Sequence, residues 1–200
     1  MYREKNTMKK LTLVILLYTL ISPTISRAGN PIFGEKQNQI MFNVGQGINR
    51  HWMIEPPMDF VPFNMLHFQY SQPMTFFRLP ARKSLNIAQT LGWGKKFINP
   101  YTRTYWNWDE MNRFIAFLSL DVPIVHSERV YGGIGISTGV QHYPTERINS
   151  MFLIGVKWFG GVRINDYWHI ELFLQHFSNA RTERPNLSYN FWGLGVARNF

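Results

Sequence analysis

The sequence predicts an all-β protein, an eight-stranded antiparallel transmembrane β-barrel of the outer membrane. Three observations support this fold class. Charged residues make up only 16% of the 200 residues and aromatic residues another 16%, which is typical of a barrel with a lipid-facing surface and aromatic girdles. Eight segments alternate between two kinds of side chain, as strands in a membrane do. The chain also ends in Phe200 with apolar residues at alternate positions before it, which resembles the C-terminal signature of bacterial outer-membrane barrels.

The composition excludes several classes of protein. The formal net charge is +9, but a nucleic-acid-binding protein would carry its basic residues in clusters and would not need seven Trp and sixteen Phe. We therefore expect no nucleic acid among the partners. The chain contains no cysteine, which rules out disulfides, thiol nucleophiles and cysteine-bound metals.

The N-terminal segment has the features of an export signal. Four basic residues among the first ten precede an apolar run from Leu11 to Ile21. Small residues then stand three and one before a cleavage point in Ser26-Arg27-Ala28. This pattern predicts a signal peptide over residues 1–28 and a single barrel domain over residues 29–200. The alternative is an uncleaved N-terminal anchor.

Eight windows of strand length follow, separated by turn residues such as Pro, Gly and Asn. They are about Gln39–Gly47, Phe63–Gln72, Ser84–Trp93, Asn112–Val122, Tyr131–Gln141, Met151–Val162, Trp168–Ser178 and Asn190–Phe200. The last one places large apolar residues such as Trp192 and Leu194 on one face, and small ones such as Gly193 and Gly195 on the other. Small residues inside and large ones outside suit a narrow barrel filled by its own side chains. A soluble lipocalin-like barrel or a β-sandwich is the alternative.

The candidate catalytic residues lie at the end of the seventh predicted strand. His176 and Ser178 are two residues apart and therefore share a face with Leu172 and Leu174. A histidine that accepts the serine proton turns a weak alcohol nucleophile into one that attacks an ester carbonyl. Asn179 follows and offers an amide N–H to a developing oxyanion. The alternative interpretation of this motif is a hydrogen-bonded cluster at a strand end.

The segment His176-Phe177-Ser178-Asn179-Ala180, followed by Pro185-Asn186 and the final strand, resembles the outer-membrane lipid A 3-O-deacylases, the PagL family. The resemblance implies an eight-stranded barrel that hydrolyses the ester-linked acyl chain at position 3 of lipid A. Ser178 would be the nucleophile and His176 the base, with no metal or organic cofactor. Lipid A or lipopolysaccharide and the lipids of the outer membrane would be the partners.

Two positions depart from the family pattern. The family has a Glu fourteen residues after the His, where this chain has Asn190. An asparagine holds the His ring through its carbonyl oxygen but supplies no charge to an imidazolium, so slower turnover is expected. Glu183 is the candidate substitute acid. Arg181 stands where the family has a Gly whose backbone helps to form the oxyanion site, and its guanidinium could contact a lipid A phosphate.

Other features carry less weight. Tyr105-Trp106-Asn107-Trp108 resembles an aromatic girdle or a surface loop that dips into the head-group layer. Four of the histidines, His51, His67, His142 and His169, are scattered without metal-ligand spacing. The competing functional hypotheses are a non-catalytic structural or binding barrel, and an esterase that acts on a phospholipid or on another acyl position.

Overall fold

The structure is a computed structural model that describes residues 37–48, 60–94, 96–98, 102–127 and 129–200. The predicted signal peptide, the predicted start of the mature chain at Gly29 and His51 lie outside these residues. In the described part of the chain, no helix is both long enough and apolar enough to cross a membrane.

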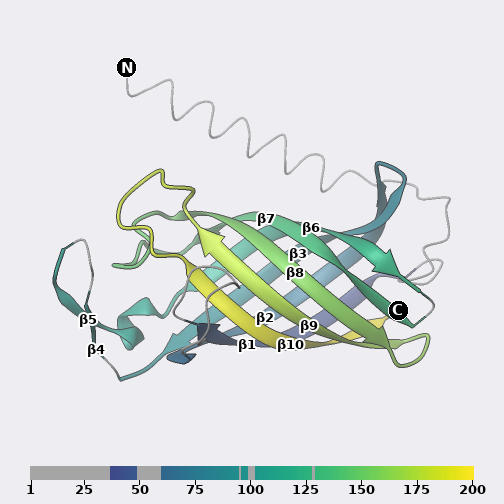
Figure 1. Cartoon of the computed structure of the whole chain (residues 1–200), viewed down its shortest axis with the longest axis horizontal. Helices are drawn as coiled ribbons and strands as arrows, with labels where there is room; N and C mark the ends of the chain where they lie inside the picture. Colours follow the sequence, from purple (N-terminus) through teal and green to yellow (C-terminus); the bar gives the residue numbers. More distant parts are fainter. Residues whose placement is uncertain (1–36, 49–59, 95, 99–101, 128) are drawn as a thin grey trace, which may run out of the picture.

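Eight antiparallel strands close into a barrel, with each strand paired to its neighbours in the chain (Figure 1). The first and last strands pair with each other over nine residues, from Gln39 opposite Asn199 to Gly47 opposite Phe191, and so complete the ring. The strands are β1 (Gln39–Ile48), β2 (Phe60–Phe76), β3 (Leu79–Gly92), β6 (Phe114–His126), β7 (Val130–Gln141), β8 (Phe152–Arg163), β9 (Trp168–Ser178) and β10 (Tyr189–Asn199). This confirms the predicted strand number and fold class.

The two ends of the barrel differ in the length of their connections. The short connections from β2 to β3, from β6 to β7 and from β8 to β9 lie at one end, together with the C-terminus (Figure 1). Longer segments connect the strands at the other end. One of them carries a small hairpin of β4 (Lys96–Ile98) and β5 (Tyr105–Asn107) and a turn of 3-10 helix, η1 (Trp108–Met111), none of which the alternation predicted. The end of β9 and the start of β10 lie at this long-loop end.

The two faces of the barrel wall have opposite characters. Outward side chains of β10 such as Trp192 and Leu194 are 41% and 47% exposed, whereas the inward Ala197 is fully buried. Gly193 faces inward where the strands crowd, since a Cβ there would lie 2.1 Å from the Val44 carbonyl oxygen. A barrel wall that exposes large apolar side chains on all sides is suited to lipid and not to water, which rules out the soluble alternative.

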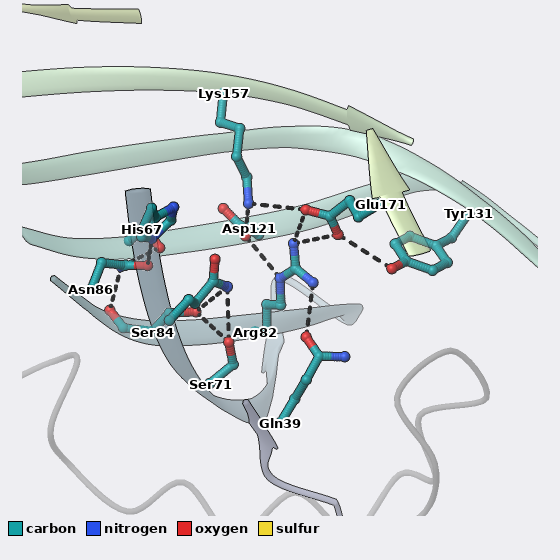
Figure 2. Close-up of polar contacts among 12 residues, drawn as sticks. Gln39, His67, Ser71, Arg82, Ser84, Asn86, Asp121, Tyr131, Lys157 and Glu171 are labelled. Atoms are coloured by element: carbon teal, nitrogen blue, oxygen red, sulfur yellow. Dashed lines mark hydrogen bonds and ion pairs between the residues drawn. The ribbon is translucent and has the colours of Figure 1, made fainter. Parts of the chain in front are cut away.

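A network of buried charges lies in the barrel interior (Figure 2). Arg82, near the start of β3, and Glu171, near the start of β9, place it toward the short turns. Arg82 Nε lies 2.8 Å from Asp121 Oδ2, and its Nη2 lies 2.7 Å from Glu171 Oε2. Lys157 Nζ bridges the same two carboxylates at 2.6 and 3.3 Å, and the Tyr131 hydroxyl donates to Glu171 at 3.2 Å. Two cations thus balance two carboxylates, so the buried charges are compensated.

Aromatic side chains fill the interior nearer the long loops. Phe63 stacks against Tyr189 and Phe191 with ring centroids 5.4 and 5.2 Å apart. Trp106 and Trp108 are only 3% and 2% exposed and belong to this core. The prediction that these tryptophans form a girdle or surface loop is therefore wrong: β5 and η1 fold them over the barrel mouth, which alternation within the barrel strands could not reveal.

Candidate active site

His176 and Ser178 lie at the C-terminal end of strand β9, on the outer face of the barrel, and both are half-buried. Strand alternation puts them on the same side as Leu172, as the sequence predicted. On the neighbouring strand β8, Ile154 lies opposite Ser178 in register. The imidazole and the hydroxyl therefore stand at the rim of the barrel, beside apolar side chains that face lipid.

Asn190 holds the ring of His176. The two residues are fourteen apart in the sequence but lie opposite each other in the β9–β10 ladder. The distance between His176 Nδ1 and Asn190 Oδ1 is 2.7 Å, and Asn190 is 7% exposed. A carbonyl oxygen can only accept, so Nδ1 carries the proton and donates it to Asn190. Nε2 is then the unprotonated nitrogen, which is the form that a general base requires.

The chain turns sharply directly after Ser178. Ala180 and Arg181 both adopt left-handed conformations, with φ of 52° and 61°. This turn brings the Ala180 backbone N–H to within 3.3 Å of Ser178 Oγ, to which it donates. An N–H donor at this oxygen favours negative charge on it, as a nucleophilic serine needs.

Asn179 is fully buried and holds the loop that follows β9. Its backbone N–H donates to Asn186 Oδ1 at 3.3 Å, and its Nδ2 donates to the Glu183 carbonyl oxygen at 2.8 Å. Its Oδ1 accepts the Arg181 N–H at 3.0 Å. The oxyanion role predicted for Asn179 therefore depends on the second N–H of its side-chain amide, and the structure gives the residue a bracing role in addition.

The two remaining predicted residues lie on the surface of this loop. Glu183 is exposed and contributes its backbone carbonyl to Asn179. Asn190 occupies the place beside His176 Nδ1 where a substitute acid would act. Arg181 is exposed at the loop surface, close in sequence to Ser178.

A second layer of residues behind the site escaped the sequence analysis. Arg147, in the loop between β7 and β8, is 3% exposed and its Nε donates to the Ser188 carbonyl oxygen at 2.5 Å. The Tyr189 hydroxyl lies 2.6 Å from Thr145 Oγ1 and donates to Gln141 Oε1 at 3.0 Å. These bonds dock the 142–151 loop onto the segment that leads into β10. In the sequence, Arg147 stands in a polar stretch after Pro144 and looks like part of a solvated turn.

Burial affects the charge of this arginine. Removal of water lowers the pKa of Arg147 to about 10, an effect that the neighbouring Tyr189 partly offsets. The guanidinium therefore stays protonated at neutral pH. A cation of this kind holds a backbone carbonyl more strongly than a neutral donor does.

Two of the scattered histidines contact polar side chains in the barrel interior. Within the described ranges, no three His, Asp or Glu side chains are grouped so that they could hold a metal ion. His67 and His169 line the barrel interior, where they lie 2.8 Å from Asn86 Oδ1 and from Asn199 Nδ2.

Comparisons with known proteins identify the family of this chain. The sequence profile of the lipid A 3-O-deacylase (PagL) family matches residues 74–199, which include all the predicted site residues. Among solved structures, the chain is similar to the crystal structure of the outer membrane enzyme PagL, with a TM-score of 0.51 and 10% sequence identity over 80% of this chain and 97% of that chain. No curated protein matches the chain. The match over more than half of the sequence, together with the closed eight-stranded barrel, shows that this chain belongs to the lipid A 3-O-deacylase (PagL) family of the outer membrane.

Proposed function

We propose that this protein hydrolyses the ester-linked acyl chain at position 3 of lipid A, with Ser178 as nucleophile and His176 as general base. One observation carries the proposal beyond the family assignment. His176 and Ser178 share the lipid-facing side of the rim, and the 2.7 Å contact between His176 Nδ1 and Asn190 Oδ1 leaves Nε2 to act as the base.

The reaction proceeds through an acyl-enzyme. Ser178 Oγ attacks the ester carbonyl carbon while its proton passes to His176 Nε2. The tetrahedral oxyanion collapses, the bond to the sugar oxygen breaks, and His176 returns the proton to that oxygen. Water then attacks the acyl-Ser178 ester and gives a proton to His176; the bond between Ser178 Oγ and the acyl carbon breaks, His176 returns the proton to Ser178 Oγ, and the fatty acid leaves. The scheme requires no metal or organic cofactor.

The surroundings of the site support the same assignment. Leu172 and Ile154 line the outer wall beside it and are 56% and 39% exposed, so an acyl chain can lie along them. The Ala180 N–H already donates to Ser178 Oγ, and one N–H of the Asn179 side-chain amide donates to Glu183, so the oxyanion role that we assign to Asn179 uses the other N–H of that amide. Arg181 is exposed on the same loop and offers a guanidinium to a lipid A phosphate.

The neutral side chain of Asn190 is expected to limit the rate of hydrolysis. An imidazolium forms each time His176 takes a proton, and a neutral amide stabilises that charge less than a carboxylate would. We therefore expect a working but slow enzyme.

Mass spectrometry of lipid A tests the proposal. Gram-negative cells that lack a deacylase of their own would express the protein, its Ser178→Ala variant, or a Ser127→Ala control at the opposite end of the barrel. We expect the parent protein and the control to remove one ester-linked hydroxyacyl chain, and the Ser178→Ala variant to remove none. Unchanged lipid A with the correctly inserted parent protein would favour the non-catalytic barrel. Loss of a different acyl chain, or of a phospholipid chain, would identify another substrate.

A further inference from the structure

We propose that Ser188 is a positioning residue that fixes the orientation of the Asn190 amide and thereby the tautomer of His176. The effect on the deacylation rate rests on the proposed function, but the orientation of the Asn190 amide does not. The residues involved lie one after another: Ser188 contacts Asn190, and Asn190 contacts His176.

An asparagine at this position creates a problem that a glutamate does not. A carboxylate presents an oxygen at either end, whereas the two ends of an amide differ. If the Asn190 amide turned over, its Nδ2 would face the ring and require an unprotonated Nδ1. The proton would then sit on Nε2, and His176 could not accept the proton of Ser178.

The hydrogen bonds of Ser188 oppose that turn. The Ser188 hydroxyl donates to the Leu187 carbonyl oxygen at 2.6 Å, so its hydrogen is engaged. Its oxygen accepts from Asn190 Nδ2 at 3.2 Å. A reversed amide would place Oδ1 against Ser188 Oγ, and the hydroxyl could donate to it only by giving up its bond to the Leu187 carbonyl oxygen. The bond to Leu187 therefore favours the amide nitrogen on the Ser188 side and the carbonyl oxygen on the His176 side.

The loop between β7 and β8 holds Ser188 in place. Ser188 is 1% exposed and adopts a left-handed conformation with φ of 56°. Arg147 fixes the backbone on both sides of this bend, because its Nε donates to the Ser188 carbonyl and its own carbonyl accepts the Leu187 N–H at 2.8 Å. The Arg147 guanidinium in turn lies over the Trp108 ring, 5.4 Å from its centroid. Arg147 is thus a second positioning residue, one step farther from the reacting atoms.

A double-mutant cycle tests this role through the deacylation rate. Ser188→Ala keeps a Cβ on the same backbone and removes only the hydroxyl. We expect kcat to fall by about twofold to tenfold, the value of one hydrogen bond, with KM unchanged. In the background of Asn190→Asp, whose side chain has the same shape but oxygens at both ends, the same change should cause no loss. Ser150→Ala, a buried serine of the neighbouring loop, is the control and should keep the parental rate.

The result that would overturn the proposal is an equal loss from Ser188→Ala in both backgrounds. Such a loss would mean that Ser188 only stabilises the loop.

Nitrogen NMR of the purified barrel, labelled with ¹⁵N on histidine, gives a readout that needs no activity. The His176 signals, assigned by their disappearance in His176→Gln, should show the proton on Nδ1 in the parent protein and a mixture of tautomers in Ser188→Ala. A proton on Nε2 in the parent protein would refute the role of Ser188. A parent protein that has the proton on Nδ1 but leaves lipid A intact would instead refute the proposed function.

Discussion

Replacing Asn190 by aspartate is expected to speed up lipid A deacylation. The change adds a negative charge but keeps the length of the side chain, so the new carboxylate oxygen takes the place of Oδ1 at 2.7 Å from His176 Nδ1. The imidazolium that forms during the reaction then gains an ionic partner.

The size of the effect follows from the geometry. Charge centres that share such a contact lie about 4 Å apart, where two unit charges attract by about 1 kcal/mol in water and about 4 kcal/mol at an effective dielectric constant of about 20. Asn190 is buried but His176 is half-buried, and the amide dipole already supplies part of the stabilisation. We expect a net gain of about 1 to 3 kcal/mol, or a rate increase of about 5- to 150-fold.

The assay follows the release of hydroxy fatty acid from purified lipid A in mixed micelles. Asn165→Asp makes the same change in charge and shape in a turn at the far end of the barrel and should leave the rate unchanged, whereas Asn190→Ala should lower it. If folded Asn190→Asp is no faster than the parent protein, the expectation that the missing charge slows turnover is wrong.

Three further predictions concern the stability of the barrel, measured by urea unfolding in detergent or lipid. Arg82→Ala leaves two buried carboxylates with fewer partners and should lower the free energy of unfolding by about 3 to 5 kcal/mol, and an unchanged midpoint would contradict the importance of the network. Gly139→Ala places a Cβ 2.3 Å from a backbone oxygen of β6 and should cost about 1 to 3 kcal/mol, whereas Gly160→Ala, with its nearest contact at 3.9 Å, should be neutral. Arg181→Gly should raise stability by up to about 1 kcal/mol because φ at this position is 61°, and a lower midpoint would show that the arginine side chain stabilises the loop.

The barrel could be predicted from the sequence because each strand has one face in lipid and one in the interior. In β6, Phe114 faces outward while Ile115, Ser119 and Asp121 face inward, so alternation alone locates the strand. The contact between His176 and Asn190 also followed from the sequence, since the spacing of fourteen residues matched the family pattern. The structure adds the strand register that places the two residues opposite each other.

The loops could not be predicted in the same way, because their side chains follow no regular alternation between two faces. Burial of Trp108 depends on how η1 folds over the mouth of the barrel, and burial of Arg147 depends on its docking against Ser188. Both are contacts between segments far apart in the sequence, and a single sequence gives no signal for them. The interior partners of Arg82 are equally hidden, since alternation shows that a charge faces inward but not which carboxylate it meets.

The outward orientation of His176 and Ser178 has a consequence for how this enzyme encounters its substrate. If the proposed reaction takes place at Ser178 on the outer wall, lipid A is expected to reach it by diffusion in the plane of the membrane. Turnover should then follow the mole fraction of lipid A in the surrounding leaflet and not its bulk concentration, so diluting it with inert amphiphile at constant total substrate should slow the reaction.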